Sequence, residues 1–167
     1  TVTYKVDGVI VKEYTDVEEG SVVPAYDYEA PEGYTFSGWD YIPDTVTGNI
    51  VISGTTAIKT FTVIYKVDGE EVAKFENVAY GSEVPAYEYE VEEGYNFSGW
   101  SEAPATVTED LVIEGTTTIN TYTVTYKVNG EVVKTESVVY GEAIPSYEYT
   151  APEGYTFSGW DAEVPGT

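Results

Sequence analysis

The sequence predicts a mainly β fold, at most α+β, built as a tandem array of small antiparallel or mixed β domains of about 61 residues each. Two repeated motifs predict this array, since a fixed period is the sequence signature of a repeat architecture. The first is Gly-Tyr-Thr/Asn-Phe-Ser-Gly-Trp and the second is Tyr-Lys-Val-Asp/Asn-Gly. The first motif ends at Trp39, Trp100 and Trp160, and the second begins at Tyr4, Tyr65 and Tyr126.

The repeats divide the chain into three units, residues 1–60, 61–121 and 122–167. The third unit stops before its copy of the Ile-Val-Ile-Ser-Gly-Thr-Thr segment that begins at Ile50. Units of roughly 60 residues are near the lower limit for an independent core. They are also longer than the roughly 20–45 residues of repeats that stack on their neighbours. We therefore expect three separate small domains, of which the third, lacking one strand, is the least stable.

Each unit begins with a pattern that predicts a β-hairpin. Val2, Tyr4 and Val6 alternate with polar residues, as expected of a strand with one buried face. Asp7-Gly8 follows directly, and this dipeptide favours the type I′ turn of a two-residue hairpin. A return strand is expected over 9–14.

The spacing after the turn differs among the units. The valine that follows the return strand lies nine positions after the turn glycine in the first two units, at Val17 and Val78, but eight positions after it in the third, at Val138. An odd difference reverses the face of the side chains unless a bulge absorbs one residue. We predict a bulge in the first two units and none in the third.

The rest of each unit also reads as extended chain. A Tyr-x-Tyr pair places two tyrosines on one strand face. An Ala-Pro-Glu-Gly turn, at 30–33 in the first unit, leads into the Phe-Ser-Gly-Trp strand, whose glycine indicates a bulge or a close backbone approach. A final strand begins at Ile50, and the chain from Thr55 to Val67 looks like a short, stiff β connection.

Composition excludes several classes of function. The chain has 30 Asp and Glu against 7 Lys, a net charge of −23, and contains no Arg, His or Cys. Without these residues there is no catalytic triad, no cysteine nucleophile and no ordinary zinc site. A surface this acidic repels nucleic acid and anionic lipid, so binding to either is disfavoured. Shared among the repeats, the charge is about −8 per unit, the upper end of ordinary values for a small soluble domain.

No run approaches the roughly 18 apolar residues of a membrane span. The chain opens on Thr1 without an initiator methionine or a signal sequence, which indicates a segment of a longer polypeptide.

The aromatic residues are the candidate core and the candidate ligand contacts. One Trp per unit, with the nearby Phe, is expected to form the structural core, because a unit of this size needs a large anchor. The Tyr-x-Tyr pairs are expected to pack across strands, with a surface that contacts a ligand as the alternative. The expected core residues are Trp39, Trp100, Trp160, Phe36, Phe97 and Phe157, and the possible ligand contacts are Tyr26, Tyr28, Tyr87, Tyr89, Tyr147 and Tyr149.

The sequence disfavours three further kinds of chemistry: calcium binding, glycoside hydrolysis and isopeptide-bond formation. Acidic clusters such as 16–19 and 88–93 could hold calcium, which needs six to eight oxygens, but no Asp-x-Asp-x-Asp loop is present. Paired carboxylates could hydrolyse glycosides, but this requires a cleft that 60-residue units seldom provide. Lys5, Lys66 and Lys127 could form isopeptide bonds, but no Asn recurs with them in every unit. We expect no catalytic residue, no cofactor and no metal.

The order of these motifs resembles the Listeria–Bacteroides repeat family, the group that includes the B repeat of internalin-type surface proteins. The resemblance is carried by Tyr122–Tyr126, Tyr140-Gly141-Glu142, Glu153–Trp160 and their copies, and it covers essentially the whole chain. It implies a small β-grasp-like domain, found in tandem on secreted or wall-attached bacterial proteins.

The function expected from repeat and resemblance together is a non-enzymatic, extracellular stalk or spacer of a bacterial cell-surface protein. Similar domains joined by short linkers give reach, and their acidity gives solubility. One alternative is an adhesion module that binds host glycan or protein through the repeated tyrosine faces. Another is a stretch of an extracellular fibre that self-associates by exchanging a strand.

Overall fold

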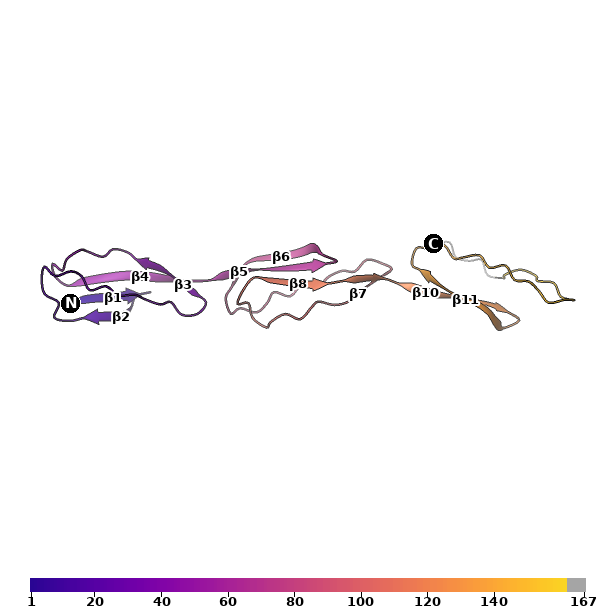
Figure 1. Ribbon diagram of the computed structural model, residues 1–167, viewed down its shortest axis with the longest axis horizontal. Coiled ribbons are helices and arrows are strands. Elements are labelled where there is room, and N and C mark those ends of the chain that lie inside the picture. The colour runs from indigo at the N-terminus through magenta and orange to yellow at the C-terminus, as the bar shows by residue number, and fades with distance from the viewer. Residues whose placement is uncertain (162–167) are drawn as a thin grey trace. The chain divides into compact units, whose positions relative to one another are not determined.

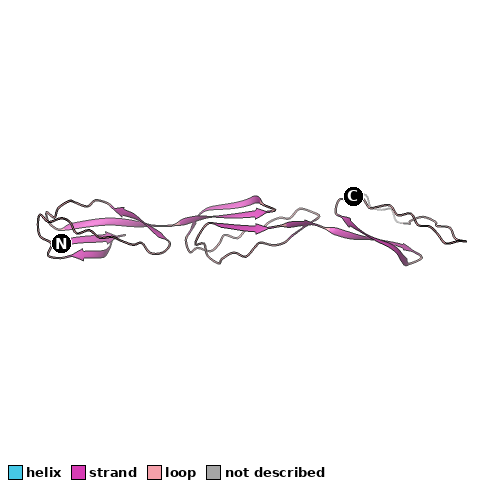
Figure 2. Ribbon diagram, in the orientation of Figure 1, coloured by secondary structure: helices cyan, strands magenta, loops and turns pink. Residues whose placement is uncertain are grey.

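The computed structural model describes residues 1–161, and these residues form strands, turns and loops without a helix (Figures 1 and 2). The mainly β fold and the array of three repeats predicted from the sequence are confirmed. In this part of the chain there is no helix long and apolar enough to cross a membrane. The end of the third predicted unit, 162–167, lies outside the described residues.

The first repeat forms one mixed four-stranded sheet (Figure 1). Its strands are β1 (Val2–Val6), β2 (Val9–Tyr14), β3 (Tyr34–Trp39) and β4 (Ile50–Ile58), in the order β2-β1-β4-β3. β1 and β2 form the antiparallel hairpin, and β1 pairs parallel to β4. The second half of β4 pairs antiparallel with β3. β4 therefore joins the two halves of the sheet.

The second repeat uses the same strands with one interruption. It contains β5 (Thr60–Val67), β6 (Glu70–Ala79), β7 (Tyr95–Phe97), β8 (Leu111–Gly115) and β9 (Thr117–Ile119). Its sheets are β6-β5-β8 and β7-β9, so β8 and β9 together correspond to β4.

The third repeat contains the hairpin of β10 (Thr121–Val128) and β11 (Glu131–Val139). The contacts of the whole chain define two compact units, whose boundary passes through the second repeat. One unit comprises Thr1–Tyr65, Ala73–Tyr87 and Glu102–Ile113, and the other comprises Lys66–Val72, Glu88–Ser101 and the chain from Glu114 onward.

The hairpin turns have the predicted geometry. Asp7 and Gly8 have φ of 51° and 83°, and the equivalent residues of the other two repeats also have positive φ. Positive φ at both central residues defines the type I′ turn, which Asp-Gly and Asn-Gly adopt at little steric cost.

The spacing difference after the turn corresponds to one backbone feature, which is separate from the bulge of the hairpin. In the first two repeats the additional residue corresponds to a residue with left-handed backbone, Asp16 at φ 56° and Asn77 at φ 58°. The predicted absence of a bulge in the third repeat is wrong. The register shifts between Tyr126 and Lys127, just as it shifts between Tyr4 and Lys5. This bulge lies close to the turn and does not depend on the later spacing, so the residue count could not reveal it.

The core of the first repeat lies between the sheet and the loops that cross it. Its fully buried members are Val2, Tyr4 and Ile52, and Val23 and Val46 contribute from the two loops. In the second repeat the equivalent Val63, Tyr65, Val107 and Ile113 are buried, and so is Val67. In the third repeat only Tyr126 and Val138 are buried among the described residues. That the third repeat is the least stable stays a prediction.

Candidate functional site

Each repeat contains an aromatic cluster around the tyrosine of its first strand. In the first repeat the ring of Tyr4 lies 4.7 Å from that of Trp39, 5.6 Å from Tyr26 and 6.3 Å from Tyr14, measured between ring centroids. The contacts to Trp39 and Tyr14 are edge-to-face, an arrangement that aromatic pairs favour. Tyr4, buried in the middle of the strand, is the centre of the cluster.

Hydrogen bonds fix the polar ends of these rings. The Tyr4 hydroxyl donates to the carbonyl of Pro24 at 2.7 Å, and Trp39 Nε1 donates to the carbonyl of Tyr26 at 2.9 Å. Tyr65 and Tyr126 make the same bond to Pro85 and Pro145. Burial raises the pKa of the Tyr4 and Tyr65 hydroxyls. These tyrosines therefore act as neutral donors that tie the loop to the sheet.

The residues expected as ligand contacts and as core lie around this centre and are half-buried. The Tyr-x-Tyr tyrosines turn their rings toward it: Tyr26 contacts Tyr4 and Trp39, and Tyr28 contacts Phe36 at 5.1 Å. In the other repeats the first tyrosine of the pair contacts the first-strand tyrosine, and the second tyrosine contacts the nearby Phe. The half-buried residues are Tyr26, Tyr28, Tyr87, Tyr89, Tyr147, Tyr149, Trp39, Trp100, Trp160, Phe36, Phe97 and Phe157. Glycan or protein binding by the outer edges of these tyrosines stays a prediction from the sequence.

The turn aspartate of the first two repeats clasps the last strand. Asp7 accepts a hydrogen bond from the Thr56 hydroxyl at 2.6 Å and another from its backbone N–H at 3.0 Å. Asp68 binds Thr117 with the same two distances. Because these bonds favour the ionised carboxylate, they lower the pKa of Asp7 and Asp68. The third repeat has Asn129 at this position.

Acid is expected to weaken these clasps. A folded-state pKa below the unfolded value adds stability that is present above the unfolded pKa, about 4, and is lost as pH falls through the folded pKa. We expect the Asp7 and Asp68 carboxyl carbons to titrate below 3.8 in an NMR titration.

The control is the double variant Asp7→Asn and Asp68→Asn, which copies Asn129. Below about pH 4 its stability should depend less on pH than that of the native chain, because the clasps no longer titrate. Equal pH dependence in the two proteins would contradict a stabilising role for the clasp.

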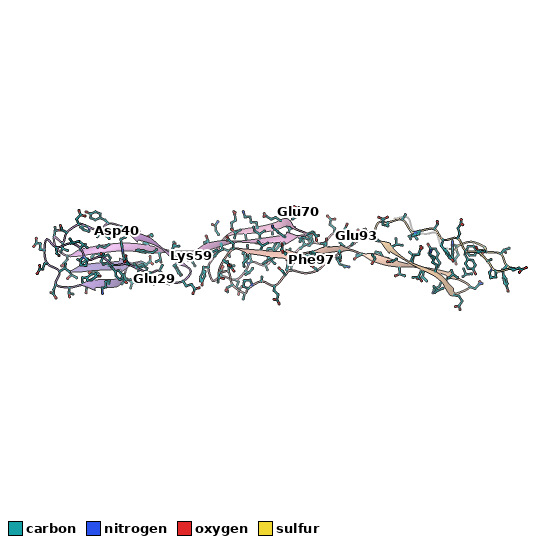
Figure 3. All side chains as sticks on the ribbon, in the orientation of Figure 1. Glu29, Asp40, Lys59, Glu70, Glu93 and Phe97 are labelled. Carbon is teal, nitrogen blue, oxygen red and sulfur yellow. The ribbon has the colours of Figure 1, made fainter. Side chains whose placement is uncertain are left out.

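The acidic residues considered for calcium do not converge. Among residues 1–161 no group of three or more Asp or Glu side chains is placed to hold a metal ion. Asp40 is held by the backbone N–H groups of Tyr41 and Ser53, which lower its pKa. Its carboxylate therefore stabilises a bend of the chain at Asp40, the residue labelled in Figure 3.

The third repeat contains a groove with a volume of about 580 Å³. It lies beside β10 and is lined by Lys127, Asn129, Tyr149, Phe157 and Trp160 among others. The equivalents of these lining residues in the other repeats show which element covers such a groove.

In the first repeat the equivalents of Asn129 and Phe157 contact β4. Asp7 binds Thr56, and Phe36 packs on Gly54, where an added Cβ would lie 2.4 Å from the ring. In the second repeat Asp68 and Phe97 meet Thr117 and Gly115 in the same way. The groove therefore has the lining that a β4-type strand covers in the other repeats, and this distinguishes it from a small-molecule pocket.

Fold and clusters together define a tandem-repeat β protein whose repeated residues serve its cores, turns and clasps. The chain belongs to the Listeria-Bacteroides repeat domain family, whose model matches residues 1–57, 61–120 and 122–167. The family resemblance inferred from the motifs is thus confirmed.

Relatives carry such repeats within much longer proteins. The chain is 28% identical over 96% of its length to a protein of Evansella cellulosilytica whose name assigns it to the membrane, and it spans 27% of that protein. It is 29% identical over 65% of its length to Internalin H of Listeria monocytogenes and spans 22% of it. Domains 3-4 of the Streptococcal High Identity Repeats in Tandem (SHIRT), from a cell surface protein, align with a TM-score of 0.30 and 17% identity, over 71% of this chain and 95% of theirs. The chain thus spans about a quarter of the length of these two curated relatives.

Sequence reasoning missed the central role of the first-strand tyrosine. Tyr4 and Tyr65 are buried, whereas Trp39 and Trp100 are half-buried. The signal was present, since a tyrosine recurs at the inward position of the first strand in all three repeats. It was read only as part of the strand alternation.

Proposed function

We propose that this chain is a non-enzymatic stalk segment of a bacterial cell-surface protein, which spaces a functional or adhesive region from the surface. The observation that carries this proposal is the connection between repeats. β4 ends at Ile58 and β5 begins at Thr60, while β9 ends at Ile119 and β10 begins at Thr121. A single residue therefore separates the last strand of one repeat from the first strand of the next.

The use of the repeated residues supports the same function. The tyrosine and tryptophan side chains fill the cores, and the turn aspartates bind the last strands. Net charge of the same sign on every repeat keeps such segments soluble and apart. Relatives named for the membrane and for internalins support a location at the bacterial surface.

A display experiment tests the stalk function. The chain is placed between a wall anchor and a fluorescent head on a bacterial surface, and residues 61–121 are duplicated once or twice. We expect the height of the head above the membrane, measured by interferometric fluorescence, to rise by the same increment with each copy. The matched control inserts a Gly/Ser segment of equal length, which behaves as a flexible coil and should give a broad range of heights. A height that does not change with copy number would contradict the proposal.

The groove of the third repeat has the lining of a strand site, and a strand from the continuing chain or from a second copy would fill it. The second copy would make the chain part of a fibre. We propose that the groove binds a strand of the Leu111–Ile119 type, with a glycine opposite Phe157, in the manner of strand addition to a sheet edge. A synthetic peptide of that sequence should protect the amides of β10 from hydrogen exchange. The same peptide with Gly115→Val should not. Sedimentation at high protein concentration then tests self-association, and a monomer throughout would contradict the fibre.

A further inference from the structure

A tyrosine of one repeat lies on a glycine of the repeat before it. The ring of Tyr80 packs on Gly33 so closely that an added Cβ on that glycine would lie 2.1 Å from the ring carbon Cδ1. Gly33 is buried and has φ of 81°, a conformation that favours glycine. Both residues belong to the same compact unit. No other residue type fits under this ring.

The single linker residue connects the same two segments through its backbone. The N–H of Lys59 donates to the carbonyl of Gly33 at 2.8 Å, and the N–H of Tyr80 donates to the carbonyl of Lys59 at 2.9 Å. The Tyr80 hydroxyl also donates to the carboxylate of Glu32, which raises the pKa of Tyr80. Lys59 is labelled in Figure 3 at the connection between β4 and β5.

The next connection repeats the arrangement. Tyr140 packs on Gly94, where an added Cβ would lie 2.0 Å from Cδ1 of the ring. The N–H of Asn120 donates to Gly94 at 2.8 Å, and the N–H of Tyr140 donates to Asn120 at 2.8 Å. These residues too belong to one compact unit. The linker residue differs between the two connections, Lys in one and Asn in the other, and both make these bonds through the backbone. The Asn120 side chain also accepts a hydrogen bond from the side-chain amide of Asn96.

The glycine turn has the same form where no tyrosine covers it. In the third repeat Gly154 has φ of 86° and is exposed, and no described atom lies within 4 Å of the position of an added Cβ. The turn hydrogen bond from Tyr155 to Pro152 is 3.1 Å long, the same as that from Tyr34 to Pro31. We call this Glu-Gly turn, on which the tyrosine ring packs in the other repeats, the seat. The turn sequence alone is thus enough to form the seat.

The tyrosine stands immediately before the glycine that follows the hairpin, and only the second and third repeats have it. Tyr80 precedes Gly81 and Tyr140 precedes Gly141, whereas Glu19 precedes the equivalent Gly20 of the first repeat. A carboxylate at this position cannot cover the glycine with a ring. It would also face the Glu that stands immediately before the seat glycine, at 32, 93 and 153, and like charges at short range repel.

We propose that the tyrosine and the turn glycine form a joint that fixes the orientation of consecutive repeats. The seat is the Glu-Gly turn of one repeat, and its partner is any repeat of this family that carries Tyr-Gly rather than Glu-Gly. Gly154 is a seat of the same kind, which accepts the tyrosine of a further Tyr-Gly repeat. The joint does not depend on the stalk function, because it concerns the angle between repeats and not their place on a cell.

Distance measurements in the full chain test the joint. The chain has no cysteine, so pairs of introduced cysteines carry spin labels at unique positions. Labels at the exposed Thr47 and Thr108 report the first joint, and labels at the exposed Glu88 and Glu148 report the second. Pulsed electron resonance then gives the width of each distance distribution.

The two joints serve as controls for one another. Tyr80→Ser should widen the 47–108 distribution about twofold, since small interfaces leave neighbouring domains free to move, and should leave the 88–148 distribution unchanged. Tyr140→Ser should do the reverse. Tyr80→Phe keeps the ring and should keep the distribution narrow, whereas Tyr80→Glu, which copies Glu19, should widen it. Tyr41→Ser removes an exposed tyrosine outside the joints and should change neither distribution.

Protection of backbone amides in each variant shows that the repeats stay folded. With folded repeats, an unchanged 47–108 width in Tyr80→Ser would overturn the joint. The free seat is tested by a longer chain in which a copy of residues 107–160 follows Thr167. Labels in the third and added repeats should give a narrow distribution with the copied Tyr140 and a broad one when that tyrosine is Glu. Equal widths would overturn the assignment of Gly154 as a seat.

Discussion

Replacing Tyr4 with alanine is expected to unfold the first repeat. Tyr4 is fully buried, its ring contacts three other aromatic rings, and its hydroxyl bonds the Pro24 carbonyl. Truncation of a buried aromatic side chain costs about 3–5 kcal/mol. At about 0.05–0.15 kcal/mol per residue, a repeat of this size has about 3–9 kcal/mol in total. Hydrogen exchange should show the amides of β1 and β4 losing their protection, while those of β10 and β11 keep theirs.

Two variants separate the parts of this effect. Tyr4→Phe keeps the ring and removes one hydrogen bond, and it should cost about 1 kcal/mol with the repeat still folded. Tyr41→Ala removes a side chain that is 72% exposed and should change the free energy of unfolding by no more than about 0.5 kcal/mol. If Tyr4→Ala were as stable as Tyr41→Ala, the aromatic cluster would not be the centre of the core.

Replacing Gly54 with valine is expected to be the second severe change. An added Cβ would lie 2.4 Å from Phe36 Cε2 and 2.9 Å from the carbonyl oxygen of Gly38. The ring can move, but the backbone oxygen can move only with the strand. Overpacking a core typically costs about 1–3 kcal/mol, and here the displaced ring also leaves Trp39, 4.8 Å away. Urea unfolding followed by tryptophan fluorescence measures the loss.

A double-mutant cycle shows whether the Phe36 ring is the cause. In a Phe36→Ala background the change Gly54→Ala should cost much less than in the native chain, because the space it needs is already empty. Gly48→Ala adds a Cβ that meets nothing within 4 Å and provides the matched control. Strictly additive costs for Phe36→Ala and Gly54→Ala would refute the close contact.

Features determined by neighbouring residues could be predicted from the sequence. Asp7-Gly8 and its copies specify the hairpin because the dipeptide itself adopts the turn, and the alternation of Val2, Tyr4 and Val6 identifies the buried face. The repeat of motifs reveals the array. The sequence left antiparallel and mixed pairing both open, since no local pattern states that β1 runs parallel to β4.

Features determined by residues far apart in the chain could not be predicted in this way. Tyr80 and Gly33 lie in different repeats, and neither has an unusual neighbourhood in the sequence. The seat became visible only when the two were found in contact. The same holds for Asp7, which looks like an ordinary turn residue until Thr56 is seen to bind it.

The parallel pairing of β1 with β4 also determines how the first repeat responds to tension. The chain enters this repeat at the start of β1 and leaves it at the end of β4, and the two strands run in the same direction, with Val2 opposite Ile50 and Val6 opposite Gly54. A pull on the two ends slides these strands past one another, so the backbone hydrogen bonds between them bear the load together. A hairpin pulled from its open end breaks its bonds one after another. A repeat with this strand order therefore resists stretching best when it is pulled by its two chain ends.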